Sequence, residues 1–252
     1  MMLRVENLRK SFGGVVATND LSMTFEKDSL TAVIGPNGAG KTTFFNQISG
    51  ALRPDYGRIL LEGQDIVGLP PAEIVRLGIG RAFQVSQLFK TLTVEESLRG
   101  ALLSPLGKSL KMTGRFPLRE TRDRAHEVMD ELGLASKADV VSGNLSHGDQ
   151  KLLDMALALV LQPKVLLLDE PVAGMGPEER EQMIETVYAL WKKGGLTLVL
   201  IEHDMEIVFR ISQHIYVLSY GRLLAEGTAQ EVRHNPAVIE AYLGTPKKEE
   251  HA

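Results

Sequence analysis

Short apolar runs separated by polar turns dominate the first third of the chain. Arg4–Leu8 and Leu21–Phe25 are typical of short strands, and the loop between them contains a Phe-Gly-Gly sequence. The run Leu30–Ile34 is mostly apolar and stops at a glycine, as a buried strand does. We expect a helix to follow at Lys41–Ile48 and a further strand at Ile59–Leu61.

The pattern changes to helical spacing between Gln87 and Gly143. Apolar residues recur there on one helical face, and Gly133 follows them as a C-cap; the residues are Ala125, Val128, Met129 and Leu132. Ser104–Pro117 is rich in Gly, Pro, Ser and Lys and is expected to be a loop or insertion. We interpret residues 87–161 as a helical subdomain.

Strands and helices alternate again after this region. The expected elements are a strand at Val165–Leu168, a helix at Glu178–Lys193, a strand at Leu196–Ile201, a hairpin of Ile215–Leu218 and Leu223–Ala225, and a final helix at Pro236–Leu243. Such alternation predicts an α/β fold, in which helices cover both faces of a mainly parallel sheet.

Composition limits the class of protein. The 252 residues are 44% hydrophobic and 24% charged, as in soluble globular proteins, and the net charge of −4 gives no basic footprint for nucleic acid. The absence of cysteine excludes disulfides and thiolate metal sites. No apolar run reaches about 18 residues, and the N-terminus lacks the apolar region of a signal peptide. We therefore expect a cytoplasmic protein whose membrane role comes through a partner.

The segment from Gly35 to Thr42 fits the phosphate-loop pattern G-x-x-x-x-G-K-[ST]. Its glycines let backbone N–H groups approach phosphate oxygens, Lys41 supplies a cation for the β and γ phosphates, and the Thr42 hydroxyl can ligate Mg²⁺. The alternative is a Gly-rich turn with an incidental lysine, which the flanking strand and helix disfavour. The residues expected to bind nucleotide are Gly35, Pro36, Asn37, Gly38, Ala39, Gly40, Lys41, Thr42 and Thr43.

Polar residues end two of the later strands. Asp169 fits a Mg²⁺ ligand, and Glu170 is placed to act as general base toward an attacking water. The alternative is that both carboxylates cap the turn at Pro171. His203 follows the next strand and can donate to a γ-phosphate or hold the water; a structural histidine is the alternative.

The segment Leu-Ser-His-Gly-Asp (145–149) allows two interpretations. Ser146, His147 and Asp149 have the residue types of a hydrolytic triad, although a triad usually draws its members from separate elements. The other interpretation is a polar helix N-terminus, where Ser146 is the cap and Gly148 lets a phosphate approach the backbone.

In order along the chain, these motifs resemble those of ATP-binding cassette (ABC) ATPases. The motifs are the phosphate loop, the Arg-Ala-Phe-Gln84 segment, Leu-Ser-His-Gly-Asp, Asp169-Glu170 and His203. The resemblance implies one ABC domain over residues 1–252. It has a P-loop core at 1–86 and 162–252, with an antiparallel β subdomain, and the helical subdomain at 87–161.

The same resemblance implies roles for further residues. Ser146 and Gly148 would close over the ATP of a second ATP-binding subunit, homologous or identical. Gln84 would report the γ-phosphate and Mg²⁺ to a membrane permease, and thus acts in both catalysis and metal binding. Phe12 would stack on adenine, although an early phenylalanine is also often core.

The chain departs from the usual family pattern at two places. His147 and Asp149 stand where the family usually has Gly and Gln. The segment Ala173–Gly176 lacks the aspartate of the usual Ser-Ala-Leu-Asp loop.

One branch of the family is more similar than the rest. The early Phe-Gly-Gly-Val-Val-Ala, Glu-Pro-Val-Ala-Gly-Met, Glu-His-Asp-Met and residues 226–244 resemble ATP-binding subunits of branched-chain (hydrophobic) amino-acid importers. This branch implies permeases, an extracellular binding protein and a position on the inner face of the membrane. Gln87–Phe89 would receive the permease, with subdomain core as the alternative.

Other functions stay open at this stage. Importers of urea and short amides share almost all of these motifs, and a soluble ABC protein of ribosomes or DNA would usually carry two cassettes. A subunit that barely hydrolyses ATP is disfavoured by Glu170 and His203. The basic residues between Lys108 and Arg124 are interspersed with acids, which favours a solvated face over a lipid contact.

Overall fold

A computed structural model describes residues 1–83, 88–103 and 119–243. The chain forms two compact units, of which the first combines Met1–Gly68 with the residues from Val199 onward, and the second is Leu69–Leu198. The expected loop at Ser104–Pro117 lies outside the described residues. The boundaries of the helical subdomain at 87–161 stay a prediction.

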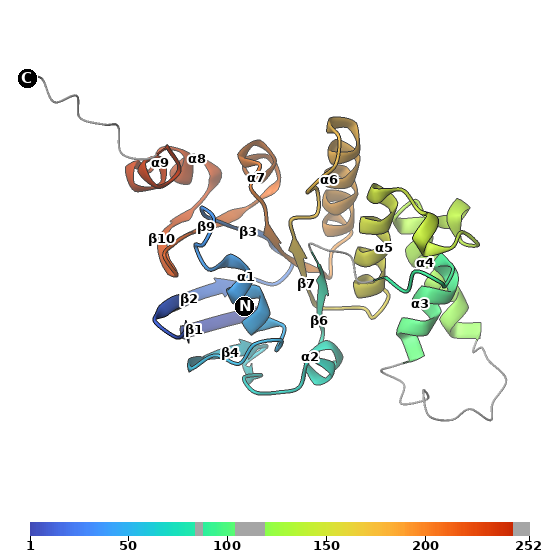
Figure 1. Ribbon diagram of the computed structural model, residues 1–252, viewed down its shortest axis with the longest axis horizontal. Coiled ribbons are helices and arrows are strands. Elements are labelled where there is room, and N and C mark those ends of the chain that lie inside the picture. The colour runs from blue at the N-terminus through green and yellow to red at the C-terminus, as the bar shows by residue number, and fades with distance from the viewer. Residues whose placement is uncertain (84–87, 104–118, 244–252) are drawn as a thin grey trace, which may run out of the picture. The chain divides into compact units, whose positions relative to one another are not determined.

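The first unit begins with an antiparallel sheet (Figure 1). Its order is β2-β1-β4-β5, formed by β1 (Leu3–Phe12), β2 (Val15–Phe25), β4 (Tyr56–Leu61) and β5 (Gln64–Asp65). Leu3 pairs with Phe25 on one side and Leu61 on the other, and all three are buried. Strands β1 and β2 are longer than the sequence predicted, and their pairing contains several register shifts.

A second group of strands carries the core of the first unit. Its order is β10-β9-β3-β8, formed by β3 (Leu30–Ile34), β9 (His214–Ser219), β10 (Arg222–Gly227) and β8 (Thr197–Ile201), which belongs to this unit from Val199 onward. β3 pairs with β9 in parallel, while β9 and β10 form the predicted antiparallel hairpin. Every residue of β3 is buried, as the apolar run predicted.

Helices complete the first unit. They are α1 (Lys41–Ile48), α7 (Met205–Ile211), α8 (Ala229–Arg233) and α9 (Pro236–Leu243). Val208, Val232 and Val238, one from each of the last three helices, join a buried cluster with Ile34 and Val217 of the strands. Burying a side chain of this size stabilises the fold by about 1.5–3 kcal/mol, so these helices are held by their apolar faces.

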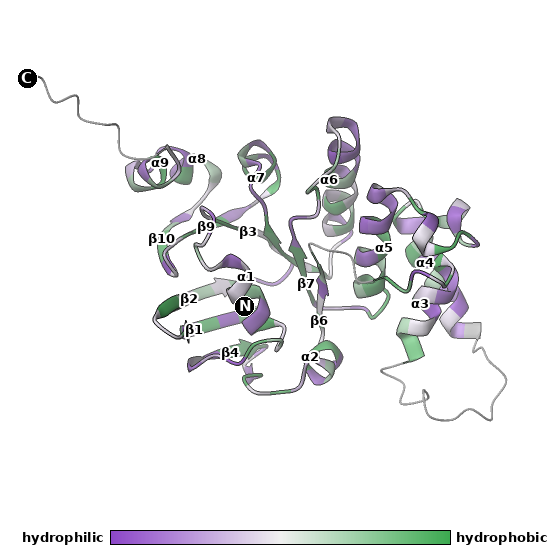
Figure 2. Cartoon of the chain, in the orientation of Figure 1, coloured by the Kyte–Doolittle hydropathy of each residue, from purple (hydrophilic) through white to green (hydrophobic). Residues whose placement is uncertain are grey.

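The second unit combines two parallel strands with most of the helices. The strands are β6 (Ile79–Ala82) and β7 (Val165–Asp169); the helices are α2 (Pro71–Leu77), α3 (Val94–Leu103), α4 (Arg119–Glu131), η1 (Ala135–Lys137), η2 (Ser142–Asn144), α5 (His147–Leu159) and α6 (Pro177–Lys192). All of β7 is buried, and Figure 2 shows its hydrophobic colouring. The sequence did not predict α2 or β6.

The predicted apolar face of α4 is confirmed. Ala125, Val128 and Met129 are fully buried. Gly133 has φ 70° and ends the helix, and the N–H of Leu134 donates to the carbonyl of Met129 at 2.7 Å. The parallel pairs, the antiparallel sheet and the covering helices confirm an α/β fold. Among the described residues, no helix is both long enough and apolar enough to cross a membrane.

Candidate nucleotide site

The phosphate loop joins β3 to α1 in the first unit, as predicted. Gly40 has φ 101°, and a Cβ there would lie 2.2 Å from the carbonyl oxygen of Ala17. At Gly35 a Cβ would lie 2.3 Å from the carbonyl oxygen of Leu218. Only glycine fits these two positions, so the sequence pattern reflects both a backbone conformation and close contacts with neighbouring segments.

Lys41 folds back over this loop. Its side chain is buried, and its Nζ donates to the carbonyl oxygen of Gly35 at 2.7 Å and to that of Pro36 at 3.2 Å. Lys41 is also the first residue of α1, and Gly40 has no side chain to cap the first N–H groups of that helix. A helix N-terminus with an adjacent ammonium is suited to bind phosphate.

Two segments distant in sequence brace the loop. The N–H of Gly221, in the turn between β9 and β10, donates to the carbonyl of Ala39 at 3.0 Å. The Tyr242 phenol of α9 is hydrogen-bonded to the backbone of Gly35, and burial raises its pKa to about 12. Neither brace could be predicted from the sequence, because both depend on how the chain returns from its C-terminal third.

Phe12 lies at the end of β1 rather than in the predicted loop. Its side chain is 50% exposed, and the Nζ of Lys10 lies 5.8 Å from the ring centroid. The alternative that Phe12 is part of the core is therefore wrong. An exposed ring offers a face on which a base can stack.

His203 is exposed and lies two residues after the end of β8. Its neighbours are fixed: Glu202 is buried, and Asp204 caps α7 by accepting from the N–H groups of Glu206 and Ile207 at 3.1 and 3.4 Å. Two residues after this strand thus differ in their surroundings: Asp204 caps α7, whereas the side chain of His203 is exposed.

The second unit holds the two carboxylates that end β7. Asp169 is 4% exposed, and its Oδ2 accepts a hydrogen bond from the Arg81 guanidinium of β6 at 2.8 Å. The parallel pairing of β6 with β7 places the arginine there. The sequence motif contained Arg81 but gave no indication of this contact.

Glu170 differs from its neighbour in both backbone and exposure. It is partly exposed and has φ 50°, a region that costs a non-glycine residue about 1–2 kcal/mol. The N–H of Ala173 donates to the Glu170 carbonyl at 3.1 Å, which closes the turn. The turn was predicted, whereas the positive φ of Glu170 is visible only in the structure.

Gln84 lies outside the described residues, but the residue before it is anchored. The N–H of Phe83 donates to the carboxylate of Asp154 at 2.6 Å. Asp154 lies on α5 and is 5% exposed. A lone acid within the apolar run of this helix was the sequence signal for such a buried acceptor.

The Ser-His-Gly-Asp segment forms the N-terminus of α5. Ser146 is the cap: its Oγ accepts from the N–H of Asp149 at 3.2 Å and donates to Oδ2 of the same residue at 2.6 Å. The Nε2 of His147 instead lies 3.3 Å from the carbonyl oxygen of Ala173. Because the serine contacts the aspartate directly, these residues do not form a hydrolytic relay.

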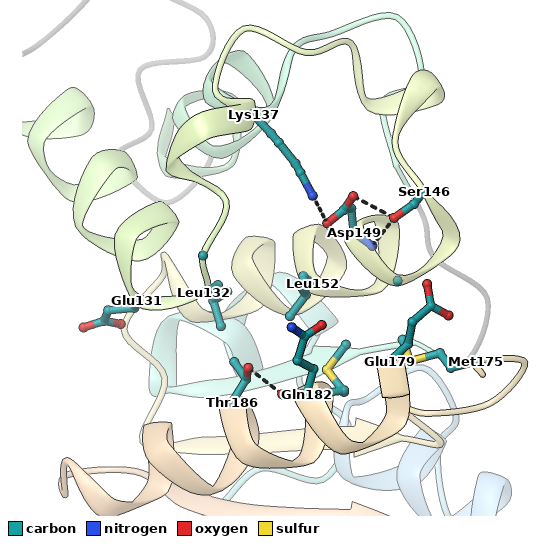
Figure 3. A pocket seen from close by; sticks show the side chains of 13 residues that line it. Glu131, Leu132, Lys137, Ser146, Asp149, Leu152, Met175, Glu179, Gln182 and Thr186 are labelled. Atoms are coloured by element: carbon teal, nitrogen blue, oxygen red, sulfur yellow. Dashed lines mark hydrogen bonds and ion pairs between the residues drawn. The ribbon is translucent and has the colours of Figure 1, made fainter. Parts of the chain in front are cut away.

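A cavity of about 450 Å³ opens beside this helix end (Figure 3). Ser146, Gly148 and Asp149 line one side of it, and α6 lines the other with Glu179 and Gln182. Lys137 of η1 forms an ion pair with Asp149 on the α5 side. Burial raises the pKa of the Asp149 carboxyl, but hydrogen bonds from Lys137 and Ser146 lower it by more. The pKa of Asp149 therefore lies below its ordinary value.

The predicted metal ligands that the structure describes are one hydroxyl and one carboxylate. Among the described residues, no group of three or more His, Cys, Asp or Glu side chains is arranged to hold a metal ion. Mg²⁺ usually binds through one or two protein oxygens, several waters and substrate phosphates. The exposed Thr42 hydroxyl of the first unit and the Asp169 carboxylate of the second are donors of that kind.

Comparison with known proteins agrees with this arrangement of motifs. The family model of the ABC transporter matches residues 18–173, and that of the branched-chain amino acid ATP-binding cassette transporter matches residues 222–248. The second match includes Tyr242, which braces the phosphate loop.

Similar proteins cover almost the whole chain. The branched-chain amino acid transport ATP-binding protein LivG of Escherichia coli K12 is 41% identical over 96% of this chain and 98% of its own. A probable LivG of Archaeoglobus fulgidus is also 41% identical, over 98% of this chain and 97% of its own. Among solved structures, the ADP conformation of an ABC transporter's ATP-binding cassette has a TM-score of 0.85 at 36% identity, over 97% of this chain and 99% of that one.

Proposed function

The chain belongs to the ABC transporter family, and we propose that it is the ATP-hydrolysing subunit of an importer for branched-chain or other hydrophobic amino acids. The match of residues 222–248 to the branched-chain cassette model carries this proposal, because it separates this chain from other ABC ATPases. The 41% identity to LivG over nearly the full length supports it.

The first unit supplies the groups that hold the nucleotide. Adenine stacks on the exposed ring of Phe12, and the phosphates lie on the loop from Gly35 to Thr43. Lys41 exchanges its contacts with the loop carbonyls for the β and γ phosphates. The Thr42 hydroxyl would hold Mg²⁺, with Asp169 and Gln84 as further ligands, and the ion would neutralise phosphate charge there.

Hydrolysis uses the side chains that end the strands. Glu170 accepts a proton from the attacking water, which its partial exposure at the end of the buried strand allows. His203 holds the γ-phosphate or the water, and Gln84 completes the site. Arg81 keeps Asp169 in place, as the buried ion pair indicates.

The closed state contains two ATP-binding subunits. The Ser146 and Gly148 segment of one subunit closes over the ATP held by the other, where the N-terminus of α5 adds partial positive charge. The second subunit is a copy of this chain or a related ATPase. Both lie on the inner face of the membrane against permease subunits, which a binding protein outside supplies with substrate.

Uptake by whole cells tests the transported class. Deletion of the gene is expected to lower ATP-dependent uptake of labelled leucine, and the wild-type gene restores it, whereas Lys41→Ala does not. Unchanged leucine uptake together with lost uptake of urea or a short amide identifies the related importer instead. Unchanged uptake of all three solutes contradicts a transport role and favours a soluble ABC ATPase.

A further inference from the structure

The acidic residue in the signature segment needs an explanation. Asp149 stands where the family usually has glutamine, at the third position of α5. If the proposed function is right, the triphosphate of the second subunit approaches this helix end. An uncompensated carboxylate there would cancel the partial positive charge of the helix and repel the phosphate.

Lys137 compensates for that carboxylate. Its Nζ is hydrogen-bonded to Oδ1 of Asp149, while Oδ2 accepts the Ser146 hydroxyl at 2.6 Å. The Asp149 side chain is 16% exposed and that of Lys137 37% exposed, so the pair lies at the rim of the cavity (Figure 3). An ammonium has three donors, so further hydrogen bonds can be made toward the cavity.

The other charges of the cavity are all acidic. Of the described residues that line it, Lys137 is the only basic one, while Glu131, Asp149 and Glu179 are acids. Lys193 pairs with Glu131 at 3.2 Å, and Glu179 accepts from the N–H of Gly176 at 3.3 Å. Lys137 therefore has no basic neighbour in the lining that could take its place beside Asp149.

We propose that Lys137 is a positioning residue of the signature: it neutralises Asp149 and holds it beside Ser146, so that the triphosphate bound by a second subunit can dock on the N-terminus of α5. Lys137 and Asp149 thus act as one electrically neutral pair in place of a neutral glutamine. This inference rests on the proposed role of Ser146 and Gly148 toward a second subunit.

ATP-induced dimerisation of the purified chain tests the proposal. In a Glu170→Gln background, where ATP turnover is expected to fall at least about 100-fold, the ATP concentration at half-maximal dimer is measured by light scattering. Lys137→Gln is expected to raise it about tenfold, because Asp149 then faces the phosphate alone. The double variant Lys137→Gln/Asp149→Gln is expected to return to within about twofold of the parent, since both charges are gone.

Three controls separate this role from a loss of structure. Lys137→Arg keeps the charge and is expected to dimerise like the parent, as is Lys192→Gln, which removes an exposed lysine outside the cavity. ATP affinity of the monomer is expected to be unchanged in every variant, because the phosphate loop is in the first unit. In an NMR titration of the monomer, Lys137→Gln is expected to raise the pKa of Asp149.

The possible failures are distinguishable. The proposal is overturned if Lys137→Gln dimerises like the parent, if the double variant is as weak as Lys137→Gln alone, or if the pKa of Asp149 does not change. No ATP-induced dimer in the Glu170→Gln parent contradicts docking on a second copy of this chain and requires a related ATPase as the second subunit, while the titration still tests the Lys137–Asp149 pair on its own.

Discussion

Asp169 and Glu170 are adjacent in the chain but have different surroundings. Asp169 is buried at the end of β7 against the Arg81 guanidinium, whereas Glu170 is partly exposed on a strained turn. A buried carboxylate paired with a guanidinium is held in one position, while a partly exposed one is accessible to water. At the scale of single residues, this difference supports the proposed roles of Asp169 as a metal ligand and Glu170 as the general base.

The role of Glu170 predicts a specific defect in Glu170→Gln. A general base contributes about 10²–10⁴-fold to the rate, so turnover is expected to fall at least about 100-fold while ATP affinity stays within a few fold. Steady-state phosphate release measures turnover, and equilibrium ATP binding measures affinity. Glu185→Gln, at an exposed position of α6, is the matched control; wild-type turnover in Glu170→Gln rules out the general-base role.

The Arg81–Asp169 pair predicts a loss of stability. Arg81→Met leaves a buried carboxylate facing an apolar side chain, which is expected to lower the free energy of unfolding by about 3 kcal/mol in urea titrations. Arg58→Met removes a surface partner of Glu6 and is expected to cost less than about 1 kcal/mol. Equal losses in the free energy of unfolding would show that the buried pair contributes no more to stability than the surface pair.

At the scale of elements, the phosphate loop depends on the segments that surround it. The Gly40 and Gly35 contacts leave no space for a Cβ, and Gly221 and Tyr242 bind its ends. The loop is therefore held in one conformation by β2, the β9–β10 turn and α9. A rigid cradle of this kind binds phosphate without a cost for ordering the backbone.

Gly40→Ala tests this packing. The added Cβ would meet the Ala17 carbonyl at 2.2 Å in a backbone conformation that alanine rarely adopts. We expect ATP affinity, measured by equilibrium fluorescence, to fall at least about tenfold, equivalent to about 1.4 kcal/mol. Gly14→Ala, where nothing lies within 4 Å, is expected to bind like wild type; similar losses in both variants would exclude the steric explanation.

Local patterns predicted some of these elements well and others not at all. The apolar runs of β3 and β7 and the glycines of the phosphate loop are local signals. The two strands and the loop could therefore be predicted from the sequence. Strand β6 was missed because Ile-Gly-Arg-Ala is short and contains no β-branched pair. Arg81–Asp169 and Lys137–Asp149 were missed because a charge's partner depends on the path of the whole chain.

At the scale of the whole molecule, nucleotide binding couples to stability. A ligand at about 100 times its Kd stabilises the folded state by about 2.7 kcal/mol, which corresponds to a rise in Tm of about 5–10 °C for a chain of this size. We expect this shift with MgATP in the wild type and in Lys27→Ala, which is exposed, but not in Lys41→Ala. A full shift in Lys41→Ala would contradict its contact with the phosphates.

ATP hydrolysis coupled to transport tests the central claim most directly. The chain is reconstituted with its permeases, any second ATP-binding subunit and the binding protein in proteoliposomes, and accumulation of labelled leucine is measured with ATP present. The account predicts leucine accumulation that requires ATP and disappears in Glu170→Gln. Accumulation that persists in Glu170→Gln, or an active ATPase that moves no hydrophobic amino acid, would contradict it.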